Sequence, residues 1–143
     1  TLIHEYAHLL TLDASQVDPS VGTCVTLELD EGCADPDSTI EAFNKRFWAT
    51  YGSDAPDAGN SDSDVAWEFY LEHEDDFVSD YAATNVVEDV AESFTTFVVE
   101  PASAQDGDTV ISQKLAFFAG YPEYEAIRER LRAEFAEELG WAE

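Results

Sequence analysis

The chain has 143 residues, of which 32 are acidic and 6 are basic, so its formal net charge is -26. Because phosphate groups are bound by Lys and Arg, this charge argues against nucleic acid as a partner and against an anionic membrane surface. An apolar content of 45% supports the core of one domain and excludes wholesale disorder. No run approaches the roughly 18 apolar residues of a membrane span.

The chain begins at Thr1 with an apolar segment, and we expect residues 1–143 to be one domain cut from a longer precursor at its N-terminal end. A targeting segment would then lie upstream. The acidity is typical either of adaptation to high salt or of an extracellular protein, and the sequence leaves both open. The acidic clusters at 54–64 and 72–76 are interpreted as a solvated face. Calcium binding is disfavoured because the spacing of an EF-hand loop is absent.

Residues 1–12 predict an apolar helix. Its apolar residues are distributed around nearly the whole circumference: Leu2, Ile3, Ala7, Leu9 and Leu10. A helix that is apolar on all sides is typical of a buried one, so we expect other elements to cover it.

The two cysteines enclose the segment TCVTLELDEGC, which predicts a short strand or hairpin near residues 24–33. The residues expected on its buried side alternate with polar ones: Val25, Leu27 and Leu29. A bridge between Cys24 and Cys33 would stabilise the fold by about 2–3 kcal/mol in the chain-entropy model. The close pair favours this disulfide and an oxidising compartment, and two buried free thiols are the alternative.

The middle of the chain predicts two helices and a loop. Ser38 and Glu41 are placed as a capping box, which opens a helix that should end near Gly52. Residues 52–64 are rich in Gly, Ser, Asp and Pro, so they predict a loop. Residues 65–72 predict a short helix.

Three further helices are expected in the C-terminal half. Residues 85–99 have a broad apolar face, with Thr84 or Asn85 as the N-cap. Residues 109–118 form the second helix, which stops at Gly120, and the third extends from residue 122 to residue 140. Its three arginines are expected to pair with neighbouring glutamates: Arg128, Arg130 and Arg132. The predicted fold is therefore mainly α-helical, with one short strand or hairpin.

The candidate chemistry lies in His4-Glu5-Tyr6-Ala7-His8, an HExxH motif. Two histidines four residues apart lie on one face of a helix, so both imidazoles can bind one zinc ion. Glu5 is the candidate general base for a zinc-activated water. A pair of hydrogen-bonded core histidines is the alternative, although burying these polar groups without a metal is costly. The third histidine, His73, is interpreted as a surface residue.

A catalytic zinc needs a third protein ligand, and with histidine nearly exhausted it should be a carboxylate. Glu88 and Glu92 are the best candidates because they lie one turn apart on a helix whose apolar face must be buried. One of them would bind the metal, and the other would accept a hydrogen bond from a ligand imidazole. Glu88 also fits the third position of a capping box, which is the alternative for this residue.

The motif HEYAH, followed downstream by YAATNVVEDVAESF, resembles the gluzincin group of zinc metallopeptidases, and most closely the family of the anthrax toxin lethal factor catalytic domain and related secreted bacterial enzymes. The matching downstream residues are Tyr81, Thr84, Asn85, Glu88, Ala91, Glu92 and Phe94. The resemblance implies the helical part of an α+β zincin, with the family's sheet upstream of this chain. It also implies secretion or a cell-surface location.

The resemblance further implies a role for each site residue. His4, His8 and Glu88 would bind zinc, and Glu92 would support a ligand from behind. Glu5 would be the general base and Tyr81 a hydrogen-bond donor to the oxyanion, with a packed loop tyrosine as the alternative for Tyr81.

Three hypotheses for function follow. The first is zinc-dependent hydrolysis of a peptide or protein substrate, in which the negative charge would favour basic substrates. The second is a zinc-binding or interaction module without turnover. The third is a purely structural helical domain in which the two histidines are core residues.

Overall fold

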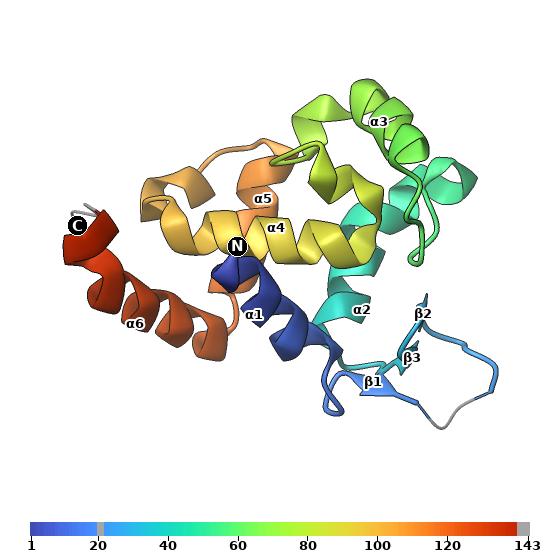
Figure 1. The fold of residues 1–143 in the computed structure, drawn as a ribbon, viewed down its shortest axis with the longest axis horizontal. Helices are drawn as coiled ribbons and strands as arrows, with labels where there is room; N and C mark the ends of the chain where they lie inside the picture. The colour runs from blue at the N-terminus through green and yellow to red at the C-terminus, as the bar shows by residue number, and fades with distance from the viewer. Residues whose placement is uncertain (20–21, 140–143) are drawn as a thin grey trace.

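The computed structural model describes residues 1–19 and 22–139. These residues contain six α-helices and a small sheet, joined by loops and short 3₁₀ segments (Figure 1). The helices are α1 (Leu2–Leu12), α2 (Thr39–Phe43), α3 (Ser63–Glu72), α4 (Val86–Val99), α5 (Val110–Ala119) and α6 (Pro122–Leu139). The strands are β1 (Val17–Asp18), β2 (Glu28–Leu29) and β3 (Gly32–Ala34). The prediction of a mainly helical fold with a short hairpin is confirmed.

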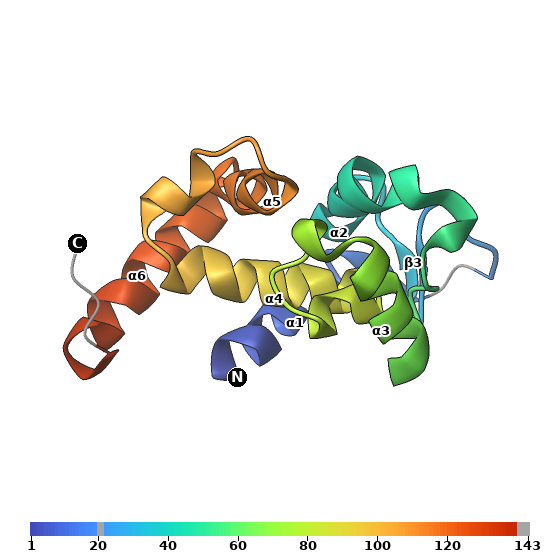
Figure 2. The same ribbon diagram turned by 90° about the horizontal axis from the view of Figure 1, so that it is seen from above.

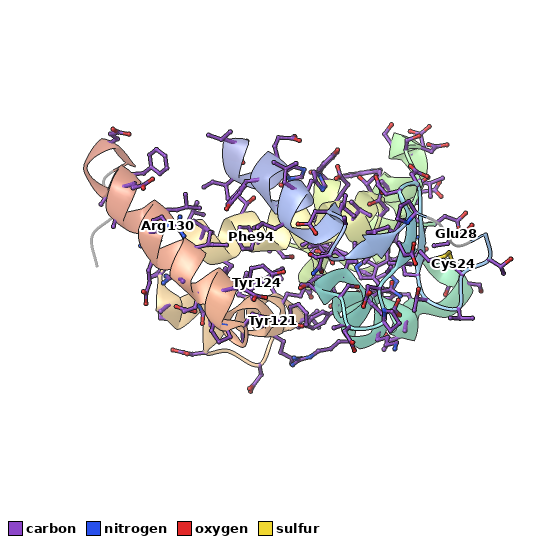
Figure 3. All side chains as sticks on the ribbon, turned by 90° about the horizontal axis from the view of Figure 1, so that it is seen from below. Cys24, Glu28, Phe94, Tyr121, Tyr124 and Arg130 are labelled. Carbon is purple, nitrogen blue, oxygen red and sulfur yellow. A yellow bond between two sulfur atoms is a disulfide. The ribbon has the colours of Figure 1, made fainter. Side chains whose placement is uncertain are left out.

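Helix α4 is the central element, and α1, α2, α5 and α6 all contact it (Figure 1, Figure 2). Its predicted apolar face is buried: Val86, Val90, Ala91, Phe94, Phe97 and Val98. The ring of Phe94 lies 5.9 Å from the ring of Tyr124 on α6, and Figure 3 labels both residues. Each such buried side chain stabilises the fold by about 1.5–3 kcal/mol, so the orientation of α4 is set by its packing.

A buried ion pair also holds α4 in place. The Lys114 ammonium of α5 lies 2.7 Å from the Asp89 carboxylate, and both side chains are fully buried. The indole of Trp48 and the hydroxyl of Ser93 also donate hydrogen bonds to Asp89. Burial raises the pKa of this carboxyl, and the neighbouring ammonium opposes that shift. Asp89 follows Glu88 in the sequence, but its side chain points to a different, fully buried side of the helix.

Helix α1 packs on α4 with one face only, so the prediction that it is buried on all sides is wrong for the described chain. Its buried residues are His4, Ala7 and Thr11. Leu2 is 80% exposed and Leu9 is 69% exposed. The packed face is the face that carries both histidines, because they share the spacing of Ala7 and Thr11.

The sheet has the order β1-β3-β2 with antiparallel pairing, and Val17 faces Ala34 while Leu29 faces Gly32. Cys24 and Cys33 form the predicted disulfide, with Cα atoms 5.3 Å apart (Figure 3). The strand is shorter than expected, because Val25 lies outside it and is 100% exposed. Gly32 has φ 138°, and a Cβ there would lie 2.5 Å from the Asp18 carbonyl oxygen, so the turn requires glycine.

The helix expected after Ser38 changes its winding. The α-helical part ends at Phe43, a π-helical turn follows over Asn44–Trp48, and a 3₁₀ segment extends over Ala49–Asp54. Ser38 caps the start by accepting from the amide of Glu41. The other half of the predicted capping box is absent, because the Glu41 carboxylate accepts from the Leu27 amide and thereby joins α2 to the hairpin.

The predicted boundaries of α3, α4 and α5 are confirmed within two residues, with Asp62, Asn85 and Thr109 as N-caps. The expected end of α6 at residue 140 lies outside the described residues. The predicted pairing of its arginines with neighbouring glutamates is present for Arg128, whose Nη1 atom lies 3.9 Å from Oε1 of Glu125. Arg128 and Arg132 are buried and donate to the last carbonyls of α4, including those of Phe97 and Val98. The last carbonyls of a helix have no partner within it and carry partial negative charge, so they are good acceptors for a buried guanidinium.

Within the described residues, no helix combines the length and the apolar character needed to cross a membrane.

Candidate metal centre

Two helices bring three potential ligand atoms together. His4 and His8 project from α1, and Glu88 projects from the first turn of α4. The Nε2 atom of His8 lies 3.0 Å from Nε2 of His4 and 2.8 Å from Oε1 of Glu88. Nε2 of His4 lies 3.7 Å from the same carboxylate oxygen. Within the described chain, this is the cluster of His, Cys, Asp and Glu side chains that could hold a metal ion.

The N-cap of α4 explains why Glu88 lies at this point. Asn85 has an extended backbone, and its side-chain oxygen accepts from the amide of Glu88 at 2.9 Å. The cap therefore uses the amide of Glu88 and leaves its carboxylate directed to the histidines. The alternative of a capping-box glutamate is excluded for this side chain, because its hydrogen bonds go to His8 and Tyr81.

Glu92 orients the first histidine. Its Oε2 atom lies 2.9 Å from Nδ1 of His4, while Oε1 accepts from the hydroxyl of Ser79 at 2.8 Å. A carboxylate only accepts, so Nδ1 of His4 donates to Glu92, and Nε2 is the ring nitrogen that lies beside His8 and Glu88. Orientation of a histidine ligand by a carboxylate is a common feature of metal sites.

The distances fit a tetrahedral divalent ion. Ligand atoms bound at 2.0–2.1 Å in a tetrahedral arrangement are separated by about 3.3 Å, which lies between the shortest and longest of the three separations. The other ring nitrogen of His8, Nδ1, is buried and has no hydrogen-bond partner among the described residues. Burial of a polar atom without a partner is costly. Two imidazoles and one carboxylate suit several first-row divalent metals, with an open position for a further ligand.

The electrostatics of the cluster couple His8 to Glu88. The hydrogen bond to Glu88 raises the pKa of His8, and burial partly opposes this shift. Burial alone would raise the pKa of Glu88, but hydrogen bonds from His8 and Tyr81 outweigh it and hold this pKa below its usual value. Protein groups alone therefore favour a proton on His8, and a bound cation would take the place of that proton.

Tyr81 lies at the mouth of the cluster in the 3₁₀ turn Tyr81–Thr84. Its side chain is half exposed, and its ring centroid lies 5.8 Å from that of His4. A hydrogen bond to Glu88, together with burial and nearby carboxylates that include Glu5, raises the pKa of Tyr81 to about 12. The phenol is therefore protonated at neutral pH and can act as a hydrogen-bond donor.

No family model, curated protein or solved structure matches this chain. The site is therefore interpreted from its own geometry. All six residues singled out in the sequence lie on α1, on α4 or in the turn before α4: His4, Glu5, His8, Tyr81, Glu88 and Glu92. Five of them are joined by the contacts above. Glu5 is exposed on α1 and acts on His8 and Tyr81 through its charge.

Sequence reasoning missed Ser79. Its hydroxyl donates to Glu92 and accepts from the amide of Ala82, so it ties the Tyr81 turn to the residue behind His4. A serine in a loop carries no signal for such a contact. His73, in contrast, lies apart from the cluster, and its half-buried ring packs on Tyr51 and Phe69.

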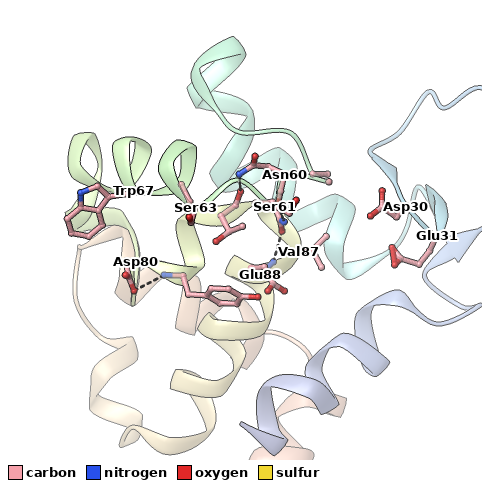
Figure 4. A pocket seen from close by; sticks show the side chains of 15 residues that line it. Asp30, Glu31, Asn60, Ser61, Ser63, Trp67, Asp80, Val87 and Glu88 are labelled. Atoms are coloured by element: carbon pink, nitrogen blue, oxygen red, sulfur yellow. Dashed lines mark hydrogen bonds between the residues drawn. The ribbon is translucent and has the colours of Figure 1, made fainter.

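A cleft of about 470 Å³ adjoins the cluster, and Tyr81 and Glu88 line both (Figure 4). Its walls come from the tip of the β2–β3 hairpin, the loop before α3, α3 itself and the start of α4. The cluster therefore opens into a space large enough for a side chain of a bound molecule.

Proposed function

We propose that this chain hydrolyses peptide bonds with one zinc ion held by His4, His8 and Glu88. The observation that supports this most strongly is the convergence of His4 Nε2, His8 Nε2 and Glu88 Oε1 from two helices, with the proton of His4 fixed on the opposite nitrogen by Glu92. A zinc ion held in such a site would polarise a carbonyl and lower the pKa of a bound water.

The roles of the protein groups follow from their placement. Glu5 follows the ligand His4 in the sequence and is exposed, so its carboxylate can accept a proton from the attacking water. It then returns this proton to the amine that leaves. Tyr81 donates its hydroxyl to the oxygen that gains negative charge on the scissile carbonyl. Its pKa of about 12 suits this role, because a phenolate could not donate.

Glu92 and Ser79 act as positioning residues. Glu92 holds the ring of His4 and also accepts from Ser79, whose loop leads into Tyr81. One carboxylate thus links the orientation of a ligand to the position of the oxyanion donor. Such support keeps the groups in place without a rearrangement during the reaction.

We place this activity outside the cytoplasm, because a disulfide such as Cys24–Cys33 persists in oxidising compartments. A secreted or cell-surface enzyme is the version of the proposal that fits both this bridge and the acidic surface.

The decisive experiment combines metal content with hydrolysis. Purified wild-type protein should contain one zinc per chain by elemental analysis and cleave a pool of internally quenched peptides. Glu5→Gln should retain zinc and lose hydrolysis, while Glu88→Ala should lose zinc as well. Zinc in the wild type without any cleavage would favour the non-catalytic module, and no zinc binding would favour the structural domain.

A further inference from the structure

The cleft beside the metal centre has a defined chemistry. Figure 4 places Asp30 and Glu31 on the hairpin at one side, Trp67 and Asp80 at the other, and Glu88 between them. Among the described residues that line the cleft, four are carboxylates and none is Lys or Arg. The other lining residues are small, polar or aromatic, so among the described residues that line the cleft no Lys or Arg balances Asp30, Glu31 and Asp80.

The cleft is built before any ligand arrives. The Asn60 side chain donates to the Thr84 carbonyl at 3.0 Å, and the Asn85 side chain donates back to the Asn60 carbonyl at 2.9 Å. These reciprocal bonds fasten the loop before α3 to the start of α4. The same Asn85 caps α4 and places Glu88, so the cleft wall and the metal ligand share one support.

The tip of the hairpin forms one side of the cleft. The Asp30 carboxylate lies against Gly59 of the loop before α3, because a Cβ built on Gly59 would be 3.2 Å from Oδ1 of Asp30. The disulfide between Cys24 and Cys33 anchors the strand that follows this tip. The carboxylates of Asp30 and Glu31 are thus carried by a short, cross-linked hairpin.

The aromatic wall adds a second type of attraction. The indole of Trp67 is 50% exposed and stacks on Tyr70 with ring centroids 5.7 Å apart. An exposed indole face attracts ammonium and guanidinium groups and also packs against methylene groups. Asp80 lies on the same side of the cleft as this indole, and Asp30 and Glu31 lie across it (Figure 4). A cleft with an aromatic wall and carboxylates on both sides suits a long side chain with an aliphatic stem and a positive head.

We propose that this cleft is a specificity pocket for a Lys or Arg side chain of the peptide substrate, whose stem packs on Trp67 and whose positive head is attracted by the carboxylates on the two sides of the cleft, Asp30, Glu31 and Asp80. The assignment to a substrate rests on the proposed function. It adds to that function the position of the pocket and the class of side chain. Binding of the side chain itself requires no turnover, so the two can be tested separately.

The first test measures binding without catalysis. The indole N–H resonance of Trp67, assigned with Trp67→Phe, is followed during titration with Nα-acetyl-arginine amide and Nα-acetyl-lysine amide. The neutral analogues are the citrulline and norleucine amides. At low salt the basic amides should shift this resonance in a saturable way. Their dissociation constants should be at least about fivefold lower than those of the neutral analogues, because charge-assisted hydrogen bonds and cation–π contacts need the positive head. Equal shifts or no shifts would overturn the pocket.

The matched variants separate the pocket from the net charge of the protein. Asp30→Asn/Glu31→Gln/Asp80→Asn should abolish the preference for the basic amides. Asp106→Asn/Asp108→Asn/Glu129→Gln removes the same charge from exposed positions outside the cleft and should retain the preference. The proposal would be overturned if the first variant retained the preference for basic amides, or if both variants lost that preference equally.

Peptide cleavage then distinguishes the pocket from the proposed function. Internally quenched peptides that differ only in Arg, Lys, citrulline or norleucine at one position should show about tenfold higher kcat/KM for the basic members, the equivalent of about 1.4 kcal/mol. Cleavage without this preference would leave the hydrolase and overturn the pocket. Binding of the basic amides with no cleavage of any peptide would leave the pocket as a binding site and overturn the hydrolase.

Discussion

Nδ1 of His4 lies 2.9 Å from Oε2 of Glu92, although the two residues are 88 positions apart in the sequence. This hydrogen bond holds a proton on Nδ1 of His4, the ring nitrogen that does not face the candidate metal position. The same carboxylate holds Ser79, so α1, α4 and the turn that carries Tyr81 meet at one side chain. The site is therefore an assembly of three segments, and its parts should respond together to mutation.

Glu92→Ala should weaken zinc binding by about 10–100-fold, because the ring of His4 loses the carboxylate that orients it. Competition with a chelating indicator measures the affinity. Glu100→Gln alters an exposed glutamate near the other end of α4 and should bind zinc as the wild type does. Unchanged affinity in Glu92→Ala would contradict the positioning role.

Tyr81→Phe should retain zinc and lower kcat by about 10²–10³-fold, because an oxyanion loses one donor. The change should affect kcat more than KM, since the hydrogen bond strengthens as the charge develops. Steady-state kinetics and metal analysis on the same preparation provide the check. A large rise in KM with kcat preserved would assign Tyr81 to substrate binding instead.

The metal-free protein should gain stability from His8 in weakly acidic solution. The hydrogen bond to Glu88 raises the pKa of His8 above its ordinary 6.5. The stabilisation that protonated His8 gives to the folded state is therefore complete below pH 6.5 and is lost as the pH rises through the raised pKa. The difference in unfolding free energy between wild type and His8→Gln should therefore shrink from pH 6 towards about pH 9. Urea unfolding in the presence of a chelator measures it.

Zinc affinity should change with pH in the opposite direction to the stability of the metal-free protein. The metal competes with the proton on His8, so binding should tighten as the pH rises through the same range. A metal affinity that does not change between pH 5.5 and about pH 8 would show that His8 is not a ligand.

Lys114→Met should destabilise the fold by about 3–5 kcal/mol, because it leaves the Asp89 carboxylate buried without its partner. The double variant Lys114→Met/Asp89→Asn removes both charges and should recover a large part of this loss. Denaturant unfolding of the two variants gives the comparison. If the double variant is as unstable as the single one, the cost comes from packing instead of from the unpaired charge.

Replacing both cysteines by serine should lower the unfolding free energy by about 2–3 kcal/mol, since the bridge closes a short loop with a sequence separation of 9. Unfolding monitored with and without reductant measures this loss in the wild type and the variant. Reductant should affect the wild type alone.

The sequence by itself indicated the six α-helices and the residues from which the candidate metal cluster is drawn. HExxH places both histidines on one face of α1 because four residues make about one helical turn. Asn85 and the apolar period of residues 85–99 determine where α4 begins and which face is buried. These features are local, so they can be read along the chain. The single-domain organisation and the zincin resemblance stay predictions.

The tertiary structure decided which side chains meet. Local spacing left Glu88 and Glu92 as equivalent candidates, and only the packing of α4 against α1 turns Glu88 to His8 and Glu92 to Nδ1 of His4. The buried Asp89–Lys114 pair and the backbone contacts of Arg132 were not predicted for the same reason. From sequence alone, a charged residue is predicted to lie in solvent. The partner that makes its burial possible belongs to an element distant in the chain, so it cannot be recognised from local sequence.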